Sequence, residues 1–219
     1  MSIAENLLKI KESLPENVSL VAVSKTKPVS DLMEAYQAGQ RIFGENKIQE
    51  MVDKWESMPK DIQWHMIGHV QTNKVKYMAP FVALIHGVDS LKLLEEINKQ
   101  ALKNERVIDC LLQIYIAEEE SKFGLDAKEM TTLLTSDTFL QMKNIRIVGL
   151  MGMATFTQNQ NQIKKEFTHL KTVFESIQKL PTDHCQLATI SMGMSGDYRL
   201  AIACGSTMVR IGSSIFGGR

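Results

Sequence analysis

The sequence predicts an α/β protein folded as a single (β/α)8 TIM barrel. Short apolar runs alternate with amphipathic helical patterns along the whole chain, and eight of the runs are strand candidates. Each parallel pair of strands needs a crossover, usually a helix, so strict alternation with eight strands indicates a closed barrel. The first strand is followed by KTKP and not by a glycine-rich phosphate-binding fingerprint. This disfavours the alternative fold, the open doubly wound sheet.

The eight strand candidates are short apolar segments bounded by polar or turn-forming residues. They cover residues 20–24, 41–44, 63–67, 82–87, 109–117, 146–151, 186–191 and 208–211. The helical patterns between them cover residues 30–38, 48–57, 73–78, 90–104, 127–135, 160–180 and 197–204. Ser30, Ser90 and Asp197 stand where helix N-caps are expected, and Gly39 stands where a left-handed C-cap is expected.

One further helix is predicted before the first strand, over residues 3–13. The last predicted strand ends at residue 211, eight residues before Arg219, so we expect no helix after it. The amino-terminal helix is then the candidate to cover that side of the barrel. No linker or change of composition divides the sequence, which predicts one domain over residues 1–219, without a carboxyl-terminal β domain.

The composition excludes several classes of function. The 25 basic and 25 acidic residues balance, which gives no reason to expect nucleic acid or an anionic membrane as a partner. No segment has the length of a membrane span, and the amino terminus lacks the pattern of a signal peptide. The three cysteines are widely spaced and fall in apolar segments, as expected of small core residues in a reducing compartment. We therefore expect a cytoplasmic protein, and a monomer because no apolar surface stripe is evident.

Lys25 is the first candidate site residue, because it stands where the first strand leaves the core. Strand alternation puts Val21, Val23 and Lys25 on one side, so Lys25 faces the barrel mouth if the valines face the interior. A poorly solvated lysine there has a lowered pKa and can form an imine. The alternative is a lysine whose stem packs while its ammonium reaches water. Lys27, held extended by Pro28, shares this direction and would lower the pKa of Lys25 further.

The loops after strands seven and eight predict a phosphate site, where such barrels commonly bind phosphate. Their sequences, SMGMSGD and RIGSS, supply small residues and hydroxyl groups, so that backbone N–H groups can approach an anion. Tight turns are the alternative explanation for either loop alone. The candidate phosphate ligands are Ser191, Met192, Gly193, Gly212 and Ser213.

Arg210 is expected at the inner end of strand eight, next to strand one. A buried guanidinium needs an acceptor, either an acidic side chain or the ring nitrogen or phosphate of a ligand. A lysine on strand one, an arginine on strand eight and a phosphate cradle beside them suit pyridoxal phosphate. We predict no metal site. His65 and His69 have metal-like spacing, but a strand-to-loop transition should turn them apart, and a polar histidine pair in a loop is favoured over zinc.

The same segments resemble the YggS/PROSC family of pyridoxal phosphate homeostasis proteins, from about Val21 to the carboxyl terminus. The motifs that carry the resemblance are VAVSKTKP, FGENKIQE, WHMIGHVQTNKVKYM, LIHGVDSLKLLEEI, SKFGL, GLMGMATF, TISMGMSGD and GSTMVRIGSSIFGGR. The resemblance implies the fold-type III barrel of the alanine racemase amino-terminal domain. It also implies cofactor contacts: a Schiff base on Lys25, Asn46 near the cofactor, Ser191, Gly212 and Ser213 at the phosphate, and Arg210 at the pyridine nitrogen.

The resemblance further implies a protein that binds pyridoxal 5′-phosphate for intracellular vitamin B6 homeostasis, without a catalytic residue. Apo forms of pyridoxal-phosphate enzymes would be its candidate protein partners. The alternative is an amino-acid racemase, which would need a tyrosine as second base, and only Tyr198 is predicted near the site. A lyase that uses Lys25 on a phosphorylated sugar is a third possibility, but it leaves Arg210 without a role. Tyr115 and Gly87 depart from the family pattern, which often has asparagine and serine there.

Overall fold

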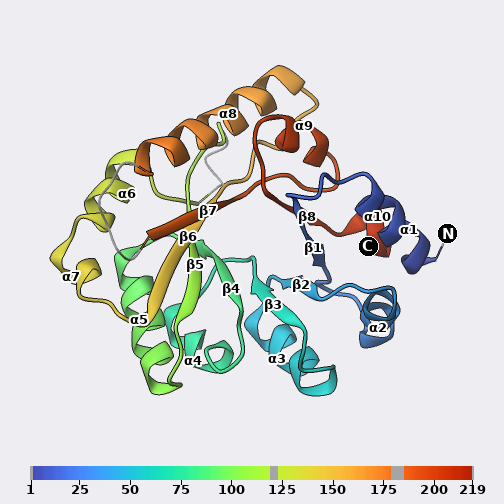
Figure 1. The fold of residues 1–219 in the computed structure, drawn as a ribbon, viewed down its shortest axis with the longest axis horizontal. Coiled ribbons are helices and arrows are strands. Elements are labelled where there is room, and N and C mark those ends of the chain that lie inside the picture. Colours follow the sequence, from blue (N-terminus) through green and yellow to red (C-terminus); the bar gives the residue numbers. More distant parts are fainter. Residues whose placement is uncertain (1, 119–122, 179–184, 219) are drawn as a thin grey trace.

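The computed structural model describes residues 2–118, 123–178 and 185–218, which form a closed barrel of eight parallel strands (Figure 1). The strands are β1 (Ser19–Val23), β2 (Ile42–Glu45), β3 (Gln63–Met66), β4 (Leu84–Val88), β5 (Ile108–Gln113), β6 (Ile145–Met151), β7 (Cys185–Ser191) and β8 (Met208–Ile211). Each strand pairs with the next in sequence order, and β8 pairs with β1 to close the ring. The predicted (β/α)8 barrel is therefore confirmed, and all eight predicted strands are present.

The helices follow the predicted alternation, with boundaries that differ by a few residues. They are α1 (Ile3–Glu12), α2 (Val29–Gln37), α3 (Ile48–Ser57), η1 (Thr72–Lys74), α4 (Val75–Met78), α5 (Leu91–Lys103), α6 (Ala127–Leu134), α7 (Asp137–Leu140), α8 (Gln160–Ile177), α9 (Tyr198–Ala203) and α10 (Ser213–Phe216). The last two residues of the predicted helix 160–180 lie outside the described residues. β5 ends at Gln113 instead of continuing to residue 117, because only Ile114 keeps a bridge beyond it.

The expectation that no helix follows the last strand is wrong, since α10 begins two residues after β8 ends. A helix of four residues is too short to show a helical periodicity in the sequence. α1 lies beside α10, with blue and red ribbons adjacent in Figure 1, and Asn6 Nδ2 donates to Ile215 O at 3.1 Å. α1 also contacts α2, where the Ala4 N–H donates to the Glu34 carboxylate at 3.0 Å. The two terminal helices thus cover this side of the barrel together.

The predicted helix caps agree with the structure in part. Ser90 is the N-cap of α5 and accepts from the N–H of Leu93, and Gly39 has φ +87° after α2, as predicted. Ser30 is not an N-cap, because α2 begins earlier, after Pro28. Asp197 occupies the N-cap position of α9, as predicted, but its carboxylate makes no hydrogen bond to the helix. It accepts instead from the Met194 N–H at 2.6 Å, which closes the loop after β7.

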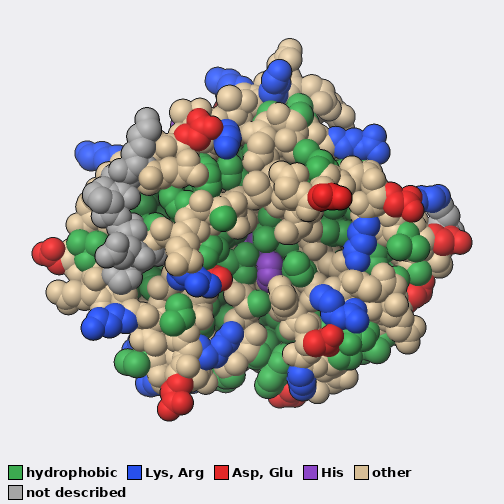
Figure 2. Space-filling model, viewed as in Figure 1, with side chains coloured by type: hydrophobic (Ala, Val, Ile, Leu, Met, Phe, Trp, Pro, Cys, Tyr) green, Lys and Arg blue, Asp and Glu red, His purple; other side chains and the backbone are tan. Residues whose placement is uncertain are grey.

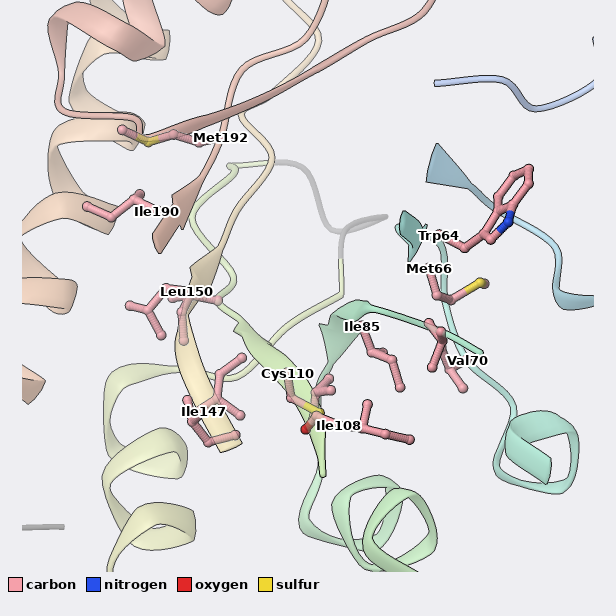
Figure 3. Close-up of a cluster of buried hydrophobic side chains, with 14 of the residues drawn as sticks. Trp64, Met66, Val70, Ile85, Ile108, Cys110, Ile147, Leu150, Ile190 and Met192 are labelled. Atoms are coloured by element: carbon pink, nitrogen blue, oxygen red, sulfur yellow. The ribbon is translucent and has the colours of Figure 1, made fainter. Parts of the chain in front are cut away.

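The side chains of the strands alternate between two buried clusters. The larger cluster fills the space between the strands and the surrounding helices, and Figure 3 shows part of it, including Trp64, Met66 and Ile85. The smaller cluster fills the barrel interior and consists of Val21, Leu84, Leu111, Met151 and Met208. Polar side chains share the barrel with this cluster, and they lead to the site described below.

The surface carries charges of both signs around the barrel (Figure 2). The same view shows a histidine near the middle of this face, between apolar side chains. Within the described ranges, none of the helices combines the length and apolar character needed to cross a membrane.

Candidate functional site

A cavity of about 770 Å³ opens among the loops that follow the strands, which is within the usual size of small-molecule sites. Five of the eight predicted cofactor-binding residues line it: Lys25, Asn46, Arg210, Gly212 and Ser213. Its apolar wall consists of Val23, Ile67, Phe123, Met153, Phe156 and Met194. The structure thus brings residues from both ends of the chain to one cavity at the carboxyl ends of the strands.

The other three predicted residues, Ser191, Met192 and Gly193, lie behind the cavity wall. Ser191 and Met192 are fully buried, and Met192 packs in the larger apolar cluster (Figure 3). Gly193 has φ +96°, and an added Cβ would lie 2.6 Å from the Cβ of Ala201. The next part of this loop, Ser195 and Gly196, lines the cavity instead. Loop composition alone could not show which of its small residues face inward.

Lys25 lies in the turn that follows β1 and is half-buried at the cavity wall. Val21 packs inside the barrel and Val23 lines the cavity, so the three residues share one side, as predicted. The next residue, Thr26, has φ +63°, a left-handed conformation that costs energy for a residue other than glycine. Its N–H donates to the Glu50 carboxylate at 2.6 Å, which holds the turn in this conformation.

A buried charged network lies beneath this turn and was not predicted from the sequence. Lys54 Nζ donates to the Ser24 carbonyl at 2.8 Å and to the carboxylates of Glu45 and Glu50 at 2.7 Å each. The Ser24 hydroxyl also donates to Glu45, at 2.6 Å. Burial raises the pKa of Glu45, although the bonds from Lys54 and Ser24 act in the opposite direction. The network fixes the backbone on both sides of Lys25, since it contacts Ser24 and Thr26.

Arg210 is almost completely buried, and its guanidinium reaches the cavity wall from β8. Nη1 donates to the carbonyl and the hydroxyl of Ser191 at 2.8 and 2.6 Å, and Nη2 donates to the Gly152 carbonyl at 3.1 Å. Burial lowers the pKa of Arg210 to about 10, while the charge of Asp197 acts in the opposite direction. Across the described residues, no carboxylate lies within ion-pair distance, so the acidic partner considered from the sequence is not observed.

Two buried histidines continue from Ser191 into the barrel. Ser191 Oγ lies 3.0 Å from His86 Nδ1, and His86 Nε2 lies 3.0 Å from His65 Nδ1. Burial lowers the pKa of His65 to about 3, and burial, His65 and Arg210 lower that of His86 well below its ordinary value. His86 was missed from the sequence, where a polar residue within the apolar run LIHGV is the signal that could have indicated it.

His65 and His69 point apart, as predicted, but they do not form a polar pair in a loop. His65 belongs to β3, where alternation between the outward-facing Trp64 and Met66 turns it into the barrel. His69 is exposed, with Nδ1 3.4 Å from the Asp89 carboxylate. The described part of the chain contains no group of three or more His, Cys, Asp or Glu side chains that could hold a metal ion.

The buried histidines predict that stability falls in mild acid. Unfolding exposes His65, whose ordinary pKa is about 6.5, so the unfolded chain binds one more proton than the native protein between pH 6.5 and about 3. The free energy of unfolding should therefore decrease as the pH falls through this range, by up to about 1.4 kcal/mol per pH unit for this residue. His86 adds to the slope, since its pKa is lowered in the same direction.

Urea unfolding at pH 7, 6 and 5 measures this slope. His69→Asn removes a histidine whose side chain is 57% exposed and keeps both buried histidines, so the decrease should persist in this variant. An unfolding free energy that stays constant from pH 7 to pH 5 in the wild type would contradict the buried, neutral state of the two histidines.

Lys27 lines the same cavity, and its ammonium is held by the carboxyl-terminal end of the described chain. Nζ donates to the Phe216 carbonyl at 2.9 Å and to the Gly218 carbonyl at 3.0 Å. These bonds connect the loop after β1, which also carries Lys25, to the end of α10.

The two departures from the family pattern, Gly87 and Tyr115, are not among the residues that line the cavity. An added Cβ at Gly87 would lie 2.7 Å from the Gly68 carbonyl oxygen, so a serine there would require the backbone to shift. None of the four tyrosines, Tyr115 included, is among the residues that line the cavity. The hydroxyl of Tyr198 lies 3.2 Å from Ser13 Oγ and accepts from Arg199 Nε at 3.2 Å.

The cavity suits a phosphorylated aromatic aldehyde. Lys25 supplies an amine, and Arg210 supplies a guanidinium whose fixed bonds leave N–H groups for an acceptor. Gly212 and Ser213 form a small-residue segment at which a phosphate can approach the backbone, next to Ser195, whose hydroxyl accepts from the Gly212 N–H at 3.3 Å. Apolar side chains on the remaining wall can cover a flat ring.

The chain is similar to known proteins in both sequence and fold. The whole chain, residues 1–219, matches the family of the alanine racemase N-terminal domain. It is 40% identical to the pyridoxal phosphate homeostasis protein of Haemophilus influenzae, over 98% of this chain and 91% of that protein. Its identity to the protein of the same name from Pasteurella multocida is 38%, over 100% and 98% of the two chains.

Solved structures give the same result for the fold. The structure of PipY from Synechococcus elongatus PCC7942 with PLP bound superposes with a TM-score of 0.89 at 34% identity, over 99% of this chain and 100% of that chain. An alanine racemase of Clostridium difficile 630, in complex with cycloserine, superposes with a TM-score of 0.81 at 14% identity. This chain covers 60% of that racemase, and at such low identity the likeness concerns the fold alone.

Proposed function

The chain belongs to the family of pyridoxal phosphate homeostasis proteins, and from that premise we propose that it binds pyridoxal 5′-phosphate as part of intracellular vitamin B6 homeostasis. The observation that carries the proposal is that Lys25, in the turn after β1, and Arg210, on the neighbouring strand β8, line one cavity together with Gly212 and Ser213. When bound, the cofactor supplies an aldehyde, a phosphate and a ring nitrogen. The protein supplies one group of matching chemistry for each.

In this proposal each residue has a distinct role. The Lys25 amine adds to the aldehyde of the cofactor with loss of one water molecule, which attaches the cofactor covalently. Arg210, which stays charged at neutral pH, would donate to the ring nitrogen and so keep that nitrogen unprotonated. Gly212 and Ser213 contact the phosphate, and Asn46 contacts the cofactor from the loop after β2. Ser191, Met192 and Gly193 act indirectly in this arrangement, since they lie behind the wall.

We further propose that the protein has no robust catalytic activity of its own. A racemase that uses a tyrosine as second base would need one at the cavity, and none of the four tyrosines is among its lining residues, which supports the non-catalytic role. The names of the two relatives refer to homeostasis and not to a reaction. In this role we place the protein in the cytoplasm as a monomer that delivers the cofactor to apo-enzymes.

The experiment that tests the proposed function is titration with pyridoxal 5′-phosphate followed by transfer. The purified protein should develop a visible absorption band with one cofactor per chain, and mixing it with an apo-enzyme should activate that enzyme. A protein that stays colourless with excess cofactor contradicts the binding proposal. Racemisation of an amino acid that depends on Lys25 contradicts the non-catalytic role and supports the racemase alternative.

Replacing Lys27 by methionine should weaken and slow cofactor uptake. The cavity loses a positive charge, and the loop after β1 loses its bonds to Phe216 and Gly218. We expect an effect of up to roughly fivefold, which corresponds to about 1 kcal/mol for a partly exposed charge. The growth of the visible band at several pH values measures it. Lys47→Met is the control, because it makes the same change of charge outside the cavity, and uptake equal to that of Lys47→Met contradicts the role of Lys27.

A further inference from the structure

Four buried polar side chains connect the cavity to the opposite side of the barrel interior. Arg210 on β8 donates to Ser191 on β7, Ser191 contacts His86 on β4, and His86 contacts His65 on β3. The donor–acceptor distances along this chain are 2.6, 3.0 and 3.0 Å. The side chains are at most 4% exposed, and all of them come from strands, which hold side chains more rigidly than loops do.

We propose that Ser191, His86 and His65 are a positioning chain that presents the Arg210 guanidinium to the cavity as a fixed hydrogen-bond donor. The site then favours a ligand with a bare acceptor at that point over an otherwise identical ligand without one. The identity of the ligand as pyridoxal 5′-phosphate rests on the proposed function. The direction of the hydrogen bonds from Arg210 through Ser191 and His86 to His65 rests on the geometry of the protein alone.

The polarity follows from the inventory of donors at each step. A guanidinium has no acceptor, so Ser191 Oγ must accept from Arg210, and the single hydrogen of the serine needs another acceptor. His86 Nδ1 is the second partner of this oxygen, and it must therefore be unprotonated. A neutral His86 then carries its hydrogen on Nε2 and donates it to His65 Nδ1. If His86 instead carried its hydrogen on Nδ1 and donated to Ser191 Oγ, the buried serine hydrogen would have no acceptor, which costs about 1–3 kcal/mol.

The histidines are in the neutral state that this polarity requires. Burial lowers the pKa of both imidazoles, to about 3 for His65, and the charge of Arg210 acts on His86 in the same direction. A protonated His86 would place two donors against Ser191 Oγ, beside a second cation. Each histidine therefore has one tautomer at neutral pH.

Arg210, at the cavity end of this series of hydrogen-bonded side chains, determines what the cavity can recognise. Of the five N–H groups of the guanidinium, three are occupied by the two oxygens of Ser191 and by the Gly152 carbonyl. The remaining two have no hydrogen-bond partner among the residues that the structure describes, and Arg210 lines the cavity. Because Ser191 holds Nη1 and Gly152 holds Nη2, the guanidinium cannot turn away from a ligand that lacks an acceptor.

The experiment compares pyridoxal 5′-phosphate with its deaza analogue, in which a C–H group replaces the ring nitrogen. The ratio of the two dissociation constants, measured from the visible band, reports discrimination at Arg210. We expect the wild type to prefer the natural cofactor by about tenfold to a hundredfold, the range for a hydrogen bond from a charged donor. Ser191→Ala should reduce the ratio, although the carbonyls of Ser191 and Gly152 still accept from the guanidinium. His86→Leu should reduce it, and His86→Asn, whose amide oxygen can replace Nδ1 as acceptor, should restore part of it.

Ser206→Ala is the matched control. Ser206 is as buried as the members of the chain, and its hydroxyl donates to the Met192 carbonyl at 2.7 Å without contacting Arg210. Its removal should lower stability but leave the ratio unchanged. A folded Ser191→Ala protein that keeps the wild-type ratio would overturn the proposal.

A second measurement needs neither ligand nor variant. Nitrogen-15 NMR of the ligand-free wild type should show His86 protonated on Nε2 and bare on Nδ1, and a proton on Nδ1 of His86 overturns the proposal. Wild-type protein that binds neither ligand would contradict the proposed function and with it the ligand preference. The tautomer of His86 would still decide the polarity of the chain, so the two failures are distinguishable.

Discussion

Replacing Lys25 by alanine is expected to abolish covalent attachment of pyridoxal 5′-phosphate completely. Lys25 is the amine in the turn after β1, at the wall of the cavity that Arg210 also lines. Without it, the aldehyde of the cofactor has no lysine held at that position, and only the weaker contacts to the phosphate and the ring remain. Borohydride reduces a lysine–aldehyde linkage to a stable amine, so mass spectrometry of the reduced protein should show the cofactor mass in the wild type and none in Lys25→Ala.

Lys27 provides the internal control, since it is a second lysine at the same cavity. Its Nζ donates to the carbonyls of Phe216 and Gly218, and addition to the aldehyde would break these two bonds. Peptide mapping of the reduced wild type should therefore place the cofactor on Lys25 and not on Lys27. Cofactor mass found in reduced Lys25→Ala protein, at Lys27 or elsewhere, would contradict the assignment.

The barrel was predictable because its strands and helices have strong local signals. The strands are short apolar runs such as SLVAV in β1, and a helix pattern or a turn separates each run from the next. α7 and α10 were not predicted, because four residues make one turn and one turn has no periodicity. Ser30 was wrongly predicted to be an N-cap, because the N-cap residue is Pro28, whose side chain cannot accept a hydrogen bond and therefore gives no N-cap signal in the sequence.

The site was predictable only where a residue stands at the end of a strand. Lys25 and Arg210 follow from alternation and from the adjacency of β1 and β8, which a closed barrel requires. The orientation of Ser191 does not follow in this way. Its hydroxyl turns toward Arg210 and His86, and two residues later the left-handed Gly193 turns the loop toward the cavity.

The supporting residues were the least predictable part of the site. Glu45 and Lys54 are nine residues apart on β2 and α3, and they meet only because the helix packs back on its own strand. His65 and His86 lie on adjacent strands, and their pairing depends on both turning inward, with His86 two residues beyond Leu84, the register partner of His65. Such contacts depend on register and packing, which a single sequence does not specify. These supporting contacts nevertheless hold Lys25 and Arg210 in place. The two residues that the sequence predicts therefore depend on neighbours that it does not predict.

Replacing Lys54 by methionine is expected to produce the largest loss of stability. The side chain of Lys54 is 6% exposed, and its ammonium is bonded to Glu45, which is fully buried, and to Glu50. Removing the cation leaves a buried carboxylate without its counterion, which typically costs about 3–5 kcal/mol. The Ser24 carbonyl loses a donor as well, so the turn that carries Lys25 should loosen. Urea unfolding followed by circular dichroism measures the loss.

Two further variants separate the cost of the unpaired charge from the loss of packing. Lys165→Met removes a lysine that is 78% exposed and 3.5 Å from Glu118, and an exposed pair of this kind contributes at most about 1 kcal/mol. Glu45→Gln in the Lys54→Met background removes the uncompensated charge, so the double variant should be more stable than Lys54→Met alone. If Lys54→Met costs no more than Lys165→Met, the network is not what stabilises this turn. If the double variant gains nothing, the cost comes from packing and not from the buried charge of Glu45.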